Sequence, residues 1–242
     1  MKKRAKKSLS QNFIKDKNIC KKITNLTNIK DKIILEVGPG YGFLTDVILE
    51  SKPKQIILIE KDYYLFNQLK DKYREFDNIK VINDDILNIK LNKFKNLKII
   101  SNLPYNISTK IILHLFKFNK NINEMIFMLQ KEVAYKFDYI LPGMNKYKFL
   151  TSIVSKYTKC FDVSSNVFIP KPKVKSTVVK FVLYKNKKNN IQNAEKFCKN
   201  IFKNVRKKIY KNIKLKKNNL DILNKRVNEL NIEELLNIYN FF

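Results

Sequence analysis

The chain has 242 residues and carries 50 lysine and arginine residues against 21 acidic ones, a formal net charge of +29. Its hydrophobic fraction of 44% is that of a globular protein, and its longest apolar runs are only strand-sized, so we expect no membrane-spanning segment and no membrane partner. The excess of positive charge favours a polyanionic partner, nucleic acid above all, although the abundance of lysine, asparagine and isoleucine is also typical of an AT-rich genome.

The cysteines and the first residues predict the compartment. Cys20, Cys160 and Cys198 are scattered without CxxC spacing, which argues against a disulfide framework or a zinc site and predicts no metal. The start "MKKRAKKSLSQNF" is basic but has no apolar core after it, so we expect neither a secretory signal nor a transit peptide there. We therefore expect a cytoplasmic protein, in a bacterium or in a reduced organelle.

Strand-type and helix-type patterns alternate through the first three quarters of the chain. In chain order, we expect a strand at 32–37, a helix at 42–50, a strand at 55–60, a helix at 63–73, strands at 79–84 and 97–102, a helix carrying Ile107, Ile111, Leu115 and Phe118, a strand at 124–130 and a helix at 147–157. This repetition predicts an α/β fold with a doubly wound parallel sheet, Rossmann-like, in which 176–184 adds a late strand.

A polar break at 185–190 divides the chain into two predicted domains, 1–185 and a small helical one at 186–242. Beyond the break, apolar residues recur every four positions and predict one amphipathic helix, with Asn193 as its cap. These apolar residues are Phe197, Ile201, Val205, Ile209 and Ile213. The last helix is expected to begin at Asn231, because "NIEE" offers an asparagine cap with Glu234 at the third helical position.

The turn after the first strand, "EVGPGYGF", is the first candidate site, because ligands of a doubly wound sheet sit beyond the carboxyl ends of its strands. Gly38, Gly40 and Gly42 form GxGxG, but Phe43 stands where a dinucleotide fingerprint needs glycine, and no P-loop is present. The sequence therefore disfavours both a bound dinucleotide and a nucleotide held by a P-loop. S-adenosylmethionine, which carries no phosphate, is the alternative ligand.

Carboxylates at the ends of the next two strands fit the hydroxyls and the amine of such a ligand. Glu60 ends the second strand, where it can accept both ribose hydroxyls, and Asp85 in "VINDDILN" can accept from the adenine amino group. Each acid alone is typical of a solvated loop. Asp84 competes with Asp85, and spacing alone does not separate them.

The fourth strand ends in "SNLPYNIST", which offers groups for a second, reacting base. Pro104 pushes Leu103 out of the helical region and leaves its carbonyl without a helical partner, so that carbonyl and the Asn102 side chain form a pair of acceptors. Two acceptors on the hydrogens of an adenine amine would help its nitrogen attack a methyl group, by positioning and by stabilising growing charge. Tyr105 offers a ring on which an extruded base can stack.

An ordered series of segments resembles the rRNA adenine N6,N6-dimethyltransferase family, particularly its small-subunit rRNA branch, over nearly the whole chain. The segments are "SQNFIKD", "ILEVGPGYGFLT", "IEKD", "NDDIL", "SNLPYNIST", "FMLQKEVA", "VFIPKPKVKSTVV" and "FKNVRKKI". The resemblance implies an enzyme that uses S-adenosylmethionine to add two methyl groups to each of two adjacent adenosines in the terminal hairpin of that RNA. The C-terminal tail is shorter than usual for the family, and "LPGMNKYKF" departs from its usual loop.

The resemblance also implies roles for residues. The segment holding Asn12 and Ile14 would close over the cofactor, Asp85 is preferred to Asp84, and Phe168 would be a second aromatic that sandwiches the base, with a core phenylalanine as the alternative. Cofactor-binding candidates are Asn12, Ile14, Gly38, Gly40, Glu60, Asp85, Ile86 and Asn102, and candidates at the target adenine are Asn102, Leu103, Pro104, Tyr105 and Phe168.

Exposed cations are the candidates for RNA phosphates, with an ordinary solvated surface as the alternative for each. They are Lys173, Lys175, Arg206, Lys207 and Lys208. We expect a monomer that acts on small-subunit rRNA within a pre-30S-type particle. Two other functions stay open: a resistance-type methyltransferase of large-subunit rRNA, disfavoured by "GPG", "FMLQKEVA" and "FKNVRKK", and a noncatalytic assembly factor, disfavoured by the intact site residues.

Overall fold

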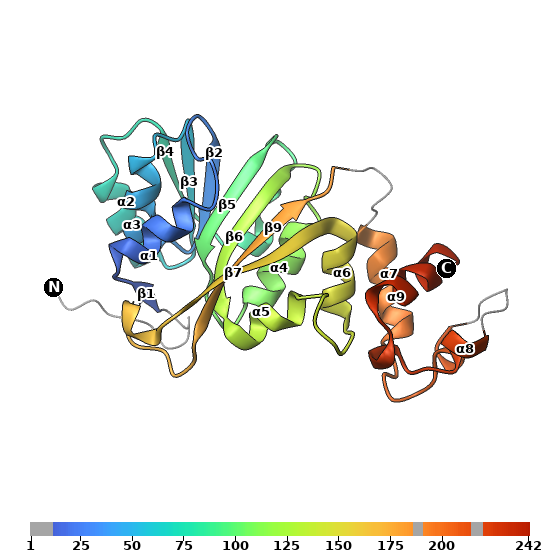
Figure 1. Ribbon diagram of the computed structural model, residues 1–242. Helices are drawn as coiled ribbons and strands as arrows, with labels where there is room; N and C mark the ends of the chain where they lie inside the picture. Colours follow the sequence, from blue (N-terminus) through green and yellow to red (C-terminus); the bar gives the residue numbers. More distant parts are fainter. Residues whose placement is uncertain (1–11, 186–190, 214–219) are drawn as a thin grey trace. The chain divides into compact units, whose positions relative to one another are not determined.

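The computed structural model describes residues 12–185, 191–213 and 220–242 (Figure 1). The chain groups into two compact units: a sheet unit, Met1–Ala134 with Thr158–Leu183, and a helical unit, Tyr135–Tyr157 with Tyr184–Phe242. The helical unit therefore takes up residues 135–157, which the sequence pattern placed in the first domain. The polar break at 186–190 lies outside the described residues, and the domain division there stays a prediction.

A seven-stranded sheet forms the centre of the sheet unit (Figure 1). In spatial order its strands are β4 (Ile79–Asn83), β3 (Gln55–Glu60), β2 (Ile33–Val37), β5 (Leu97–Asn102), β6 (Ile122–Gln130), β9 (Ser176–Leu183) and β7 (Ser155–Val163). The first five of these run parallel, as expected, and the late strand predicted at 176–184 is β9, which pairs antiparallel with β6. Residues 164–175 connect β7 to β9 and hold a 3-10 turn and the two-residue strand β8 (Phe168–Ile169).

Alternate residues of the central strands point to opposite faces of the sheet, and both faces are apolar. On one face Ile34, Ile56 and Ile100 belong to a core that also takes in Leu44 and Leu69 from the covering helices. The helices of this face are α1 (Lys17–Thr24), α2 (Phe43–Glu50) and α3 (Tyr63–Lys72). This burial on both faces explains why the strands are continuous apolar runs.

The opposite face of the sheet packs against α4 (Ser108–Phe116). The ring of Phe116 lies 5.8 Å from that of Phe181 in β9, edge to face, and Phe181 lies 6.2 Å from Phe127 in β6. Aromatic pairs of this kind add stabilisation beyond their buried area. The helices predicted at 42–50, at 63–73 and after residue 107 are confirmed in α2, α3 and α4.

Several elements escaped the sequence prediction or differ from it. The helix α1 begins after Asp16, whose carboxylate accepts from the amides of Asn18 and Ile19, and α5 (Lys131–Phe137) follows β6 directly. The helix α6 (Lys146–Val154) is shorter than the predicted 147–157, because the chain turns into β7 at Ser155.

The helical unit is built around three aromatic rings. Phe149 of α6 lies 5.1 Å from Phe197 of α7 (Ile191–Ile201), and both contact the ring of Tyr239 in α9 (Ile232–Asn240) at 5.3 and 5.2 Å. A further short helix, α8, spans Leu220–Leu223. The capping box at the last helix is confirmed, since Asn231 accepts from the amide of Glu234 at 2.8 Å and Glu234 accepts in return from that of Asn231 at 3.0 Å.

The single amphipathic helix predicted through residue 213 was wrong. α7 ends at Ile201, and Asn193 lies inside it rather than at its cap. The side-chain amide of Asn212 folds back and donates to the carbonyls of Ile201 and Asn204, so it satisfies the end of the helix. Ile209 is still buried, but within a 3-10 turn. None of the helices in the described part of the chain has the length and apolar character needed to cross a bilayer.

A buried ion-pair network fastens the loop after α1 to the sheet. Glu124 of β6 accepts from Lys98 of β5 at 2.6 Å, from Lys180 of β9 at 2.8 Å and from the Thr27 hydroxyl. Lys98 also donates to the carbonyl of Asn28 at 2.7 Å. Burial raises the pKa of the Glu124 carboxyl, but the hydrogen bonds from Lys180 and Lys98 outweigh it, and the pKa lies below its usual value.

We predict that Glu124→Gln lowers the free energy of unfolding by about 3 kcal/mol at neutral pH, because the two ammonium groups lose their shared anion in a buried place. Urea denaturation followed by circular dichroism measures the loss. Asp162→Asn is the matched control: Asp162 also pairs with two lysines, but its side chain is 38% exposed, so the cost there should stay below about 1 kcal/mol.

The parent chain and Glu124→Gln also test how the contribution of Glu124 to stability changes with pH. The folded-state pKa of Glu124 is depressed, so its contribution is present above the unfolded pKa and is lost as pH falls through the folded-state pKa. The gap between the parent chain and Glu124→Gln should therefore close in acid. A gap that widens as pH falls would contradict the assignment.

Candidate functional site

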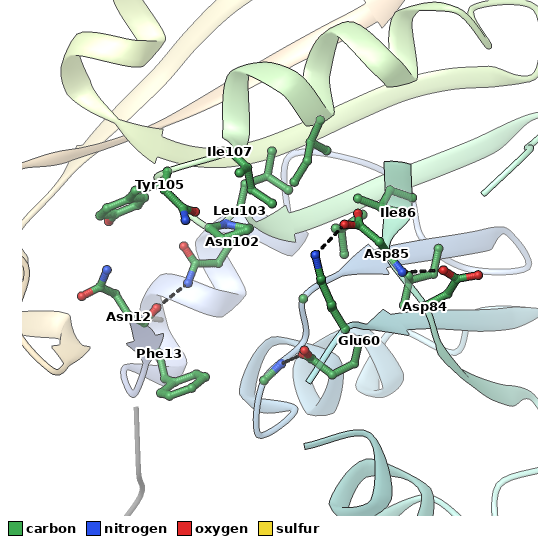
Figure 2. A pocket seen from close by; sticks show the side chains of 18 residues that line it. Asn12, Phe13, Glu60, Asp84, Asp85, Ile86, Asn102, Leu103, Tyr105 and Ile107 are labelled. Carbon is green, nitrogen blue, oxygen red and sulfur yellow. Dashed lines mark hydrogen bonds and ion pairs between the residues drawn. The ribbon is translucent and has the colours of Figure 1, made fainter. Parts of the chain in front are cut away.

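A pocket of about 230 Å³ opens beyond the carboxyl ends of β2, β3, β4 and β5. The neighbours of β2 are β3 on one side and β5 on the other, so the pocket lies where the strand order reverses. Figure 2 shows Asn12, Asn102 and Tyr105 toward one end of the pocket and Glu60, Asp84 and Asp85 toward the other. Its lining residues are Asn12, Phe13, Val37, Gly38, Gly40, Ile59, Glu60, Lys61, Asp84, Asp85, Ile86, Asn102, Leu103, Pro104, Tyr105, Asn106, Ile107 and Ile111.

The glycine turn forms the floor beneath this pocket. The Gly38 amide donates to the Ile59 carbonyl at 2.9 Å, which ties the turn to β3. Gly40 has φ +62°, and a Cβ there would stand 2.6 Å from the ring of Phe13. Phe13 thus closes over the turn, a role the sequence prediction missed although "SQNF" was recognised as a site segment. A side chain at residue 40 would collide with this ring, so the spacing requires glycine.

Glu60 is held by the turn that faces it. One carboxylate oxygen accepts from the Gly40 amide at 3.2 Å and the other from the Asp62 amide at 2.9 Å, and the residue is 5% exposed. Burial raises the pKa of the Glu60 carboxyl, while the two backbone hydrogen bonds oppose that shift. A carboxylate has about four lone-pair sites, so Glu60 keeps acceptor capacity for a ligand hydroxyl.

Both acids of the third strand end line the pocket, and they have different partners. Asp85 forms an ion pair with Lys61 at 2.8 Å and accepts from the Leu87 amide at 2.9 Å, whereas Asp84 accepts from the amide of Asp85 itself. Burial raises the pKa of the Asp85 carboxyl, but the bonds from Lys61 and Leu87 outweigh it and hold the pKa below its usual value. The charged form of Asp85 is therefore favoured.

The turn after β5 presents an unpartnered acceptor. The Asn102 side-chain nitrogen donates to the Asn12 carbonyl at 2.7 Å, so the amide cannot flip without losing that bond. Among the described residues no group donates to the buried Oδ1 of Asn102. The Leu103 amide donates to the Met128 carbonyl at 3.3 Å, and Pro104 beside it has no N–H of its own. A buried oxygen without a donor is costly unless a ligand supplies one.

Tyr105 stands on the wall of the same pocket. Its hydroxyl lies 2.6 Å from the Ser176 hydroxyl at the start of β9, and its carbonyl accepts from the Ser108 hydroxyl at 3.3 Å. Burial raises the pKa of the Tyr105 phenol, so the group stays neutral in ordinary buffers. The ring is half-buried and available to a base that enters the pocket.

Two predicted site residues do not line this pocket. Phe168 is 2% exposed and belongs to the core of the sheet unit, where β8 pairs antiparallel with β1 (Phe13–Ile14) and sets Phe168 opposite Ile14. The structure thus favours the core alternative for Phe168, because its ring is enclosed by apolar neighbours. Ile14 is also buried, and it lines a smaller cavity together with Gly38 and Asn102.

The cations predicted to bind phosphate are all exposed. Lys173 and Lys175 lie in the sheet unit between β8 and β9, and Arg206, Lys207 and Lys208 lie in the helical unit after α7. Lys61, at the pocket, is a cation that the sequence prediction missed; its position directly after Glu60 was the available signal. Residues 12–185, 191–213 and 220–242 contain no cluster of three or more histidine, cysteine or acidic side chains placed to hold a metal ion.

Solved structures of similar fold support this architecture. The 23S rRNA methyltransferase ErmE superposes with a TM-score of 0.78 at 20% identity, covering 95% of this chain and 98% of that one. A dimethyladenosine transferase from Plasmodium falciparum gives a TM-score of 0.75 at 22% identity, covering 95% and 100%. At these identities the likeness establishes the fold: an α/β, Rossmann-like methyltransferase sheet.

Curated relatives are more similar in sequence. The ribosomal RNA small subunit methyltransferase A of Hydrogenobaculum sp. is 37% identical over 97% of this chain and 92% of its own length. The protein of the same name from Malacoplasma penetrans is 40% identical over 87% and 78%. The family model described as ribosomal RNA adenine dimethylase matches residues 2–242. With this match and the pocket described above, the chain belongs to the ribosomal RNA adenine dimethylase family.

Proposed function

We propose that this chain transfers methyl groups from S-adenosylmethionine to the N6 amino groups of two adjacent adenosines in the 3'-terminal hairpin of small-subunit rRNA. Family membership supports the reaction, and the relatives named small subunit methyltransferase A support the substrate. The observation that carries the mechanism is the buried Oδ1 of Asn102 on the pocket wall, which has no donor within the described part of the chain.

The residues present fit the cofactor. Gly38 and Gly40 leave bare backbone where an amino acid moiety can lie, Glu60 keeps acceptor capacity for a ribose hydroxyl, and Asp85 is an ionised acceptor for the adenine amine. Asn12 and Ile86 would contact it from the two ends of the pocket. S-adenosylmethionine, when bound, supplies an electrophilic methyl group on a sulfonium.

The target base is handled by the turn after β5. Asn102 Oδ1 and the Leu103 carbonyl would accept the two hydrogens of the adenine amine, while Pro104 keeps the turn from continuing as a helix. The two acceptors orient the nitrogen and stabilise the positive charge that grows on it, because both are fixed in position before the reaction. Tyr105 would stack on the extruded base.

The substrate in this proposal is the rRNA within a pre-30S-type particle, and the enzyme acts as a monomer in the cytoplasm or in a reduced organelle. The basic residues that follow α7 and those ahead of β9 would contact its phosphates. The net charge of +29 supports such a polyanionic substrate.

Mass spectrometry of rRNA after incubation with the protein and S-adenosylmethionine tests the function. We expect two methyl groups on each of two adjacent adenosines near the 3' end of small-subunit rRNA, supplied as particles that lack them. Methyl groups on large-subunit rRNA instead would favour the resistance-type alternative, and the absence of any methylation would support a noncatalytic factor.

Asn102→Ala should lower methyl transfer by at least about 100-fold, because it removes an acceptor needed when charge develops on the amine. RNA affinity should change little. The measurements are kcat with saturating RNA and a filter-binding dissociation constant. Asn78→Ala is the matched control, since Asn78 also donates to a backbone carbonyl, that of Pro53 at 3.2 Å, but lies outside the pocket. Equal turnover in the two variants would refute the role of Asn102.

RNA affinity should fall steeply with salt, because each neutralised phosphate contributes a slope of about −0.7 to −0.9 in log K against log salt. Changing Arg206, Lys207 and Lys208 together to Gln should make that slope shallower by about 2. Changing Lys30, Lys32 and Lys54 removes the same charge from the amino ends of β2 and β3, at the edge away from the pocket, and should alter the slope less. Equal effects of both triple variants would mean that only net charge matters.

A further inference from the structure

The segment "KPKVKSTVV" holds a buried hydroxyl that the proposed mechanism does not use. Ser176 is the first residue of β9, is fully buried, and sits opposite Gln130, the last residue of β6. Burying a hydroxyl without a partner is costly, so its partner matters. Within the described ranges, the hydrogen bond recorded for this hydroxyl joins it to Tyr105 Oη at 2.6 Å.

This bond restricts the ring of Tyr105 in a specific way. The phenol oxygen lies on the long axis of the ring, so a bond to it fixes where that axis points and leaves only rotation of the ring about the axis. The other end of the residue is also held, since its carbonyl accepts from the Ser108 hydroxyl. Tyr105 is thus pinned at both ends, with the ring between them on the pocket wall.

The anchor itself is rigid. The amide of Lys131, directly after β6, donates to the Lys175 carbonyl at 3.0 Å, next to Ser176. The following residue, Thr177, donates from its hydroxyl to Asp162 of β7 at 2.8 Å. Ser176 therefore fixes the Tyr105 ring relative to three neighbouring strands, β6, β9 and β7.

We propose that Ser176 is a positioning residue that holds the Tyr105 ring in place for the target adenine. This inference rests on the proposed function, in which Tyr105 stacks on that base. Without the bond the ring can rotate away from the pocket wall. The adenine stacked on it is then no longer held at a fixed distance from Asn102. Small misplacements of a reacting nitrogen lower kcat strongly and change binding much less.

Ser176→Ala should therefore lower kcat about 10-fold while the KM for RNA changes by less than about 3-fold. Thr177→Val is the matched control: Thr177 is equally buried and loses a hydrogen bond on the same strand, but that bond goes to Asp162 and not to Tyr105. We expect similar losses of thermal stability in the two variants and a loss of kcat only in Ser176→Ala.

A double-mutant cycle with Tyr105→Phe isolates the bond, because phenylalanine keeps the ring and removes the hydroxyl. If Ser176 acts through that hydroxyl, the double variant should be no slower than the slower single variant within about 3-fold. Losses that multiply in the double variant would show independent roles and overturn the proposal.

Stacking can be measured apart from chemistry with 2-aminopurine at the target position of the RNA hairpin, since this base has no 6-amino group to methylate. The parent protein and Thr177→Val should quench its fluorescence more than Ser176→Ala does. Equal quenching by all three proteins would overturn the proposal. If the parent protein transfers no methyl group to any rRNA, the proposed function fails. If the parent protein methylates and Ser176→Ala has an undiminished kcat, only the role of Ser176 is refuted.

Discussion

The site depends on the side-chain amide of Asn102, whose nitrogen is held by the protein while its oxygen faces the pocket. The nitrogen of Asn102 is committed to the Asn12 carbonyl, which leaves the buried oxygen of the same amide without a donor among the described residues. The amide therefore keeps one orientation, with its acceptor side available. Because Asn12 precedes β1 and β1 pairs with β8, this orientation depends on residues 12–14 being in place.

The pocket residues at the strand ends could be predicted from the sequence, because the fold brings these strand ends together. Gly38, Glu60, Asp85 and Asn102 lie at or just beyond the ends of four different strands. Parallel strands bring their carboxyl ends to one edge of the sheet, so residues at successive strand ends become neighbours. The cap of α9 was predictable for a local reason: Asn231 and Glu234 satisfy each other over one helical turn.

What sequence could not supply depended on tertiary contacts. Phe168 lies in a motif segment, but pairing of β8 with β1 turns its ring into the core, and no local pattern encodes that pairing. The four-residue apolar period after residue 197 continues past Ile201, yet the side chain of Asn212 folds back and ends α7 there. Likewise, the Ser176 contact with Tyr105 joins residues 71 positions apart.

The most direct test is a crystal structure of the full chain with S-adenosylhomocysteine and a small-subunit rRNA hairpin carrying the two target adenosines. The account predicts one adenine extruded into the pocket, with its N6 within hydrogen-bond distance of Asn102 Oδ1 and the Leu103 carbonyl and its face on the Tyr105 ring. An adenine bound elsewhere, or an Asn102 oxygen satisfied by another protein group, would contradict it.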